Sequence, residues 1–134
     1  MSLLLRPDIT PTHTSVLTLV MGLAAAKACN QVLKRRLGEK APMVQVKWPN
    51  DLVLEGRKLA GILTELSTEV DYINHVVIGI GINVNTQAFP EEIAATANSM
   101  RLATGQIFSR AELTACCMER FEECYEIFSR TEDL

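Results

Sequence analysis

The chain has 134 residues, of which 48% are hydrophobic and 22% are charged, and its formal net charge at pH 7 is −3. This composition excludes a disordered chain, and the length is too short for two ordinary domains, so one soluble globular domain with a single core is expected. The weak negative charge gives no electrostatic reason to expect nucleic-acid binding.

Membrane insertion and secretion are also not predicted. The longest apolar stretch, Val16–Ala26, contains Thr18 and Gly22 and ends at Lys27, which makes it too short to cross a bilayer. Met1 leads directly into a strand-like run without the basic segment of a signal peptide. A cytoplasmic location without a membrane partner is therefore expected.

Cysteine usage agrees with a reducing compartment. The spacing of the cysteines contains no Cys-x-x-Cys pair, and both histidines lie far from them in sequence, so no metal site is predicted. Buried free thiols that act as small hydrophobic groups explain this pattern. The four cysteines are Cys29, Cys116, Cys117 and Cys124.

The first predicted elements are a short strand, Leu3–Arg6, and a helix from residue 14 or 15 to Leu37. Apolar residues recur at helical spacing in the second segment. Basic residues in its last turn complement the helix dipole, and Gly38 can form a left-handed cap. The residues expected on the apolar stripe are Val16, Leu19, Val20, Leu23, Ala24 and Lys27.

Three or four antiparallel strands are predicted between residues 43 and 85. In the first, side-chain alternation places Val44, Val46 and Trp48 on one face, so Trp48 is expected in the core. Lys47 then lies on the opposite face. Pro49-Asn50 is a favourable turn pair, because proline presets the backbone angle and asparagine tolerates the next position.

Charged residues converge around this turn. Asp51 follows it, residues 52–54 form a short strand, and Glu55-Gly56 closes a second turn. A third strand, from Lys58 to about Ser67, would bring Lys58 back beside Asp51 and Lys47. A lone strand lysine is usually a solvated edge residue, but two lysines and an acid within twelve positions favour a convergent site.

The last strand of this region carries glycine on one face only. Val76, Ile78, Ile80, Ile82 and Val84 alternate with Val77, Gly79, Gly81, Asn83 and Asn85. Glycine inside a strand marks a bulge, a bend or a ligand lying against the backbone. The glycine face is therefore either the floor of a pocket or a crowded sheet crossing with capping asparagines. A dinucleotide fingerprint is a poor match, because Val84 occupies its sixth position and Asn85-Thr86-Gln87 is not a good helix start.

Two helical segments are expected after residue 85, which makes the fold class α+β. Pro90 opens a segment that reaches toward Gly105, and Ser109-x-x-Glu112 is a capping box before a last helix. The apolar residues of that helix recur in steps of four and three, and they are Leu113, Cys117, Phe121, Cys124 and Phe128.

Three motifs in this order resemble the central catalytic domain of biotin protein ligases. They are Lys47-Trp48-Pro49-Asn50-Asp51, Gly56-Arg57-Lys58-Leu59-Ala60-Gly61-Ile62-Leu63 and Gly79-Ile80-Gly81-Ile82-Asn83. The resemblance is close over residues 2–85 and looser over 86–134. It implies a mixed, largely antiparallel sheet with helices packed on one face, as in biotin and lipoate ligases and the class II aminoacyl-tRNA synthetase-like core.

The resemblance also implies an activity and its residues. Such ligases join biotin to ATP as biotinyl-adenylate, with Mg²⁺, and transfer the biotinyl group to a lysine of a biotin carrier domain. Lys58 matches the lysine at the acyl-phosphate, Lys47 is a second cation, and Asp51 matches the acid that orients the incoming amine. The matching binding residues are Asn50, Gly61, Ile62, Gly79, Gly81 and Asn83, and no residue matches a protein ligand for a resident metal.

Some family features have no match, so residues 1–134 are expected to be a partial catalytic domain. The glycine- and arginine-rich loop before the first strand, the C-terminal small β-barrel and the DNA-binding domain of repressor members have no counterpart in this sequence. Two alternatives stay open: a lipoate-type ligase, and a non-catalytic module for dimerisation or carrier docking. A homodimer is compatible with each of them.

Overall fold

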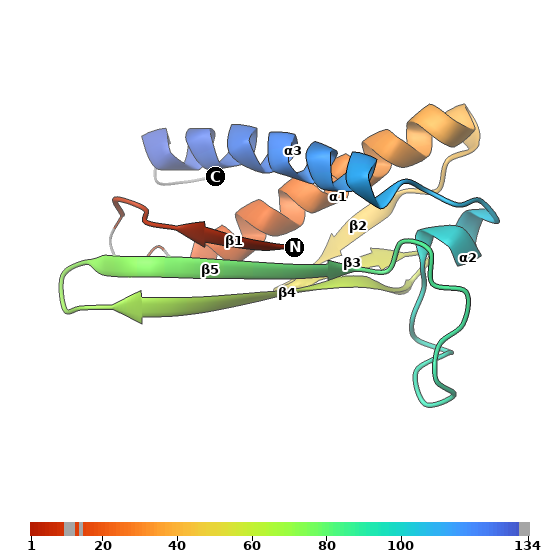
Figure 1. The fold of residues 1–134 in the computed structure, drawn as a ribbon, viewed down its shortest axis with the longest axis horizontal. Helices are drawn as coiled ribbons and strands as arrows, with labels where there is room; N and C mark the ends of the chain where they lie inside the picture. The colour runs from red at the N-terminus through yellow and green to blue at the C-terminus, as the bar shows by residue number, and fades with distance from the viewer. Residues whose placement is uncertain (10–12, 14, 132–134) are drawn as a thin grey trace.

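A five-stranded antiparallel sheet forms one layer of the computed structural model, which describes residues 1–9, 13 and 15–131 (Figure 1). The strands lie in the order β1-β5-β4-β3-β2, so neighbours along the chain from β2 to β5 are also neighbours in the sheet. The strands are β1 (Ser2–Leu5), β2 (Val44–Lys47), β3 (Asp51–Leu54), β4 (Arg57–Thr68) and β5 (Ile73–Ile82).

Two long helices form the second layer on a single face of the sheet (Figure 1). They are α1 (Ser15–Leu37) and α3 (Arg110–Thr131), and shorter turns of helix are η2 (Gly38–Lys40) and α2 (Met100–Thr104). The described architecture confirms the predicted α+β class with helices on one face. Residue 14, one of the two predicted starts of α1, lies outside the described residues.

The apolar stripe predicted for α1 was only partly correct. Val20 and Ala24 are buried, but Leu23 is 38% exposed and Lys27 is exposed. Because α1 is covered both by the sheet and by α3, its buried surface is wider and rotated relative to the prediction. The buried residues of α1 are Leu17, Val20, Met21, Gly22, Ala24, Ala25, Ala26, Ala28, Cys29, Val32 and Leu33.

This helix also has the length and composition of a membrane-spanning helix, contrary to the expectation that its apolar stretch is too short to cross a bilayer. In the fold most of it is buried against the sheet and α3, as in the core helix of a globular domain. Its predicted end at Leu37 is confirmed, and Gly38 has a positive φ of 61° as expected for a left-handed cap.

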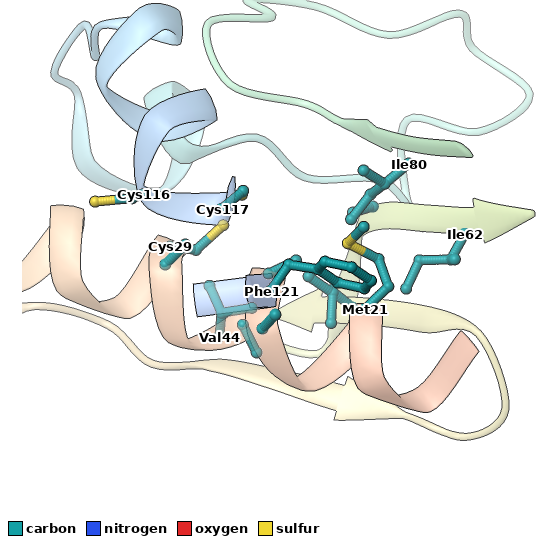
Figure 2. Close-up of a cluster of buried hydrophobic side chains, with 14 of the residues drawn as sticks. Met21, Cys29, Val44, Ile62, Ile80, Cys116, Cys117 and Phe121 are labelled. Atoms are coloured by element: carbon teal, nitrogen blue, oxygen red, sulfur yellow. The ribbon is translucent and has the colours of Figure 1, made fainter. Parts of the chain in front are cut away.

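The alternation predicted for β5 is confirmed. Ile78 and Ile80 are 0% and 5% exposed beneath the helices, whereas Gly81 is exposed on the opposite face. Figure 2 shows Ile80 of β5 and Ile62 of β4 directed toward Met21 of α1 and Phe121 of α3. The helix-covered face of the sheet therefore holds the core, and the other face is open.

The placement of Trp48 in the core was wrong. Strand β2 ends at Lys47, and Trp48 lies in the turn to β3 with 72% of its surface exposed. Alternation holds only while the backbone stays extended, so it cannot be continued into the turn. Val46 is also 41% exposed, although it lies beside Gly22 of α1, because β2 is the edge strand.

The helical segment predicted between Pro90 and Gly105 is much shorter than expected. Only Met100–Thr104 is helical, capped by the Ser99 hydroxyl, which accepts a hydrogen bond from the Leu102 amide at 2.9 Å. Gly105 ends it in a left-handed conformation. The residues before Ser99 form turns that pack against β4 instead of a helix.

Helix α3 begins at the predicted cap, and its predicted buried stripe is confirmed. The Glu112 amide donates to the Ser109 hydroxyl at 3.1 Å, but the Glu112 carboxylate accepts from Arg35 of α1 at 3.1 Å instead of closing the capping box. The capping residue was therefore recognised correctly, while its partner contributes a contact between the two helices.

All four cysteines are buried free thiols, as predicted. Cys29 of α1 and Cys117 of α3 face each other between the two helices (Figure 2). Burial, reinforced by the neighbouring thiols, raises the pKa of Cys29, and burial together with Cys116 raises the pKa of Cys117 to about 11. Both thiols therefore stay protonated at neutral pH.

Candidate active site

A row of four paired residues crosses the open face of the sheet. Lys47 pairs with Asp51, Asp51 with Gly61, and Gly61 with Gly81, so the row runs from β2 to β5. Directly paired residues in neighbouring strands project to the same face. Two predicted catalytic residues and two predicted binding glycines are thus brought together.

Lys58 joins this row through a β-bulge. Leu52 pairs with Ala60, but the next residue, Val53, pairs with Lys58, so Leu59 is an extra residue in β4. In a regular strand without a bulge, Lys58 and Gly61 would lie on opposite faces, because they are three positions apart. A bulge re-aims side chains in this way and is common beside active sites.

The bulge brings the Lys58 ammonium to Asp51. The distance from Lys58 Nζ to Asp51 Oδ1 is 3.5 Å, with the two side chains 55% and 28% exposed. A methyl group at Gly61 would lie 3.3 Å from the same ammonium nitrogen. Glycine at position 61 therefore leaves room for the ion pair to lie across the sheet.

Residues after β5 complete a hollow beside this ion pair. Lys58 donates its amide hydrogen to the Thr96 carbonyl at 2.8 Å, so the 95–96 segment is held next to β4. The hollow has a volume of about 310 Å³. Its lining residues are Lys47, Asp51, Val53, Gly56, Lys58, Ala95 and Thr96.

Gly79 and Gly81 leave the open face nearly flat. A methyl group at Gly81 would meet no atom within 4 Å, and one at Gly79 would come no closer than 3.7 Å, to the Leu63 carbonyl oxygen. These glycines are therefore not required by crowding in the described structure. Of the two explanations for the glycine face, the structure favours a floor over a crowded sheet crossing.

The other predicted binding residues have structural contacts. The Asn50 side chain donates to the Ile62 carbonyl at 3.1 Å, while the Asn50 carbonyl accepts from the Ile62 amide at 2.9 Å. The Ile62 side chain is buried under α1, so only its backbone is near the open face. The Asn83 side chain donates to the Asn98 carbonyl at 3.2 Å.

Sequence reasoning missed several residues of this region. Leu63 is 65% exposed on the open face, where it pairs with Gly79. Continuing the alternation from Gly61 would have found it. No local signal points to Thr96 or Asn98, because they reach the site only through contacts with β4.

The arrangement places Lys47, Lys58 and Asp51 around one hollow, next to the paired glycines Gly61 and Gly81 on the open face. It offers fixed positive charge to a phosphate or carboxylate oxygen and a flat surface to a planar group. Among the described residues no cluster of three His, Cys, Asp or Glu side chains could hold a metal ion.

Comparison with protein families identifies the relationship. The model of the biotin/lipoate A/B protein ligase family matches residues 1–83, which include all three motifs. The chain belongs to this family.

Relatives in the family show the same similarity beyond the matched segment. The bifunctional ligase/repressor BirA of Bacillus subtilis is 40% identical over 129 residues, which cover 93% of this chain. The BirA of Escherichia coli is 33% identical over 130 residues, 97% of this chain. The chain spans 37% and 38% of the length of these relatives.

Solved ligase structures of the family share the fold. The apo biotin protein ligase of Aquifex aeolicus has a TM-score of 0.81 and 31% identity, with 96% of this chain and 53% of that chain covered. The same enzyme in complex with biotin and ATP has a TM-score of 0.79 and 30% identity, with 96% and 50% covered. The described fold therefore corresponds to about half of these ligases.

Proposed function

We propose that this chain carries the central part of a biotin protein ligase active site. The observation that carries the proposal is the row Lys47, Asp51, Gly61 and Gly81, with Lys58 placed beside it by the bulge. Similarity to ligases named for biotin, including one solved with biotin and ATP, supports the choice of substrate.

In the first half-reaction a biotin carboxylate oxygen would attack the α-phosphorus of ATP, and the bond to pyrophosphate would break. Negative charge then concentrates on the phosphate oxygens, and preformed cations stabilise such charge. Lys58 and Lys47 both line the hollow, which supports this role for them. The glycine floor would accept the flat part of the substrate.

Mg²⁺ fits this site as a companion of the nucleotide. Magnesium usually binds through one or two carboxylates and substrate phosphates. Asp51 is the carboxylate that lines the hollow, and the described residues form no cage of their own for a metal. Bound with ATP, the ion would be held chiefly by the substrate phosphates, whose charge it would neutralise, and the Asp51 carboxylate would stay available to the incoming amine.

In the second half-reaction the lysine amine of a carrier domain would attack the acyl carbon, and AMP would leave. A free lysine is almost wholly ammonium at neutral pH, so it must lose a proton first. Asp51 lies 3.5 Å from Lys58 and remains 28% exposed, so its carboxylate can reach an incoming ammonium and accept the proton.

The proposal is tested by pyrophosphate release with ATP, Mg²⁺ and either biotin, lipoate or no acid. Release that depends on biotin is expected. Release that depends on lipoate would place the chain among lipoate-type ligases. If neither acid supports release, the alternative of a non-catalytic docking or dimerisation module replaces the proposal. Sedimentation of the same sample tests whether the chain forms a homodimer, which the sequence left open.

A further inference from the structure

The backbone of Lys58 is held by a segment outside the sheet. The regular ladder between β4 and β5 ends where Ala60 pairs with Ile82. Beyond it, Lys58 forms a parallel bridge with Ala97. The Lys58 amide donates to the Thr96 carbonyl, and the Asn98 amide donates to the Lys58 carbonyl, both at 2.8 Å.

The same segment stabilises the bulge. In a regular strand, consecutive carbonyl groups point to opposite neighbours. Here the Lys58 carbonyl accepts from the Asn98 amide and the next carbonyl, that of Leu59, accepts from the Asn83 amide at 2.9 Å. Both carbonyls thus accept hydrogen bonds from residues that follow β5. This arrangement accommodates the extra residue, Leu59.

Asn98 fixes this segment to the end of β3 and to the residue that follows β5. Its side-chain amide donates to the Leu54 carbonyl at the end of β3 at 2.8 Å, and its own carbonyl accepts from the Asn83 side chain at 3.2 Å. Its side-chain oxygen accepts from the Ser99 amide at 2.9 Å. Asn98 is fully buried, so these contacts do not compete with water.

We propose that Asn98 is a positioning residue for Lys58. By anchoring residues 96–98 to the β3–β4 hairpin, it holds the bulge that aims the Lys58 ammonium at Asp51 and the open face. The catalytic consequence rests on the proposed function, in which Lys58 stabilises charge during adenylate formation. The local consequence, protection of the Lys58 backbone, does not depend on any activity.

Asn98→Ala is the test variant, and Asn30→Ala is its matched control. Asn30 also clasps a backbone segment, because it donates to the Val44 carbonyl at 3.0 Å and accepts from the Val44 amide at 2.7 Å. That clasp joins α1 to β2 and makes no contact with the 96–98 segment. Both variants lose amide–backbone hydrogen bonds, so a general loss of stability is common to them.

Amide hydrogen exchange at Lys58 gives the first readout. Exchange should accelerate about tenfold in Asn98→Ala, the effect of roughly one lost hydrogen bond, and should follow only global stability in Asn30→Ala. Equal acceleration in the two variants would overturn the proposal. If Asn98→Ala does not fold, amide exchange in the unaltered chain tests the proposal. The Lys58 and Asn98 amides should then have equal protection from exchange. A difference above tenfold would contradict the proposal that Asn98 positions Lys58.

Single-turnover adenylate formation at saturating biotin and ATP gives the second readout. The rate should fall about tenfold to a hundredfold in Asn98→Ala, because a displaced catalytic group loses its alignment, while biotin affinity changes less than twofold. An unchanged rate despite faster exchange would show that Lys58 needs no such positioning. If the unaltered protein forms no adenylate, the proposed function fails. The exchange result alone then tests whether Asn98 positions Lys58.

Discussion

The two faces of the sheet are built from the same strands but meet different demands. Under α1 and α3, side chains such as Ile78 and Ile80 are buried and fill a continuous core. On the open face the same strands carry glycine, lysine and aspartate, with Asp51 and Lys58 in a partly exposed ion pair. Stability depends on the face covered by α1 and α3. The residues of the open face are therefore free to take part in binding and catalysis.

The largest expected effect comes from a change on the open face: Asp51→Asn should slow transfer to the carrier lysine. The amide keeps the size of the carboxylate but cannot accept a proton, so transfer should slow by roughly 10²–10⁴-fold with adenylate formation closer to normal. Glu65→Gln, which neutralises an exposed carboxylate on the neighbouring strand β4, is the control. Equal damage to both half-reactions in a single-turnover assay would show that Asp51 instead holds the nucleotide or its Mg²⁺.

Lys58→Ala should give the next largest effect, this time on adenylate formation. Removing one cation aimed at developing charge slows such steps by roughly 10²–10³-fold. The unfolding free energy in urea should change by less than about 1 kcal/mol, because a partly exposed ion pair contributes little. Lys34→Ala, at an exposed lysine of α1, should leave the rate unchanged. A Lys58→Ala variant with a normal rate would remove Lys58 from the site.

Gly81→Ala tests whether glycine at position 81 is needed to leave room for a ligand or is needed for the fold. The new methyl group would meet no protein atom within 4 Å, so the unfolding free energy should stay the same or rise by about 0.4–1 kcal/mol. If biotin lies on this floor, its affinity should fall by roughly 1–3 kcal/mol, the usual cost of overpacking. Calorimetric titration with biotin measures this, and unchanged affinity would mean that the floor does not contact it.

The smallest effect concerns the covered face and appears at alkaline pH. The Cys117 thiol has its pKa raised from 9.0 to about 11, chiefly by burial. The unfolded chain therefore loses this proton first, and stability falls by about 1.4 kcal/mol per pH unit as pH rises from 9 to 11. In denaturant unfolding at several pH values, Cys117→Ala should reduce this slope by about one proton.

Leu113→Val provides the control for this pH dependence, because Leu113 is buried on the same helix and carries no titratable group. It should lower stability without changing the slope. Adenylate formation below pH 9 should be unaffected by either variant, since neither side chain reaches the open face. A slope that Cys117→Ala leaves unchanged would contradict the assignment of this proton to Cys117.

Much of the fold and of the candidate site could be predicted from the sequence, wherever the deciding forces are local. The alternation of β5, the stripe of α3 from Leu113 to Phe128 and the left-handed Gly38 each follow from backbone geometry and burial over a few residues. The three motifs likewise indicated the family and the residues that converge near Asp51.

Contacts between distant segments set the points where these local rules stop. Trp48 left the core because β2 ends one residue before it, and the expected helix after Pro90 became turns packed against β4. Lys58 reached the face of Asp51 through a bulge held by Asn98, which is 40 positions further along the chain. Hydrogen bonds between such distant segments leave no periodic signal in the sequence, so alternation alone could not place Lys58.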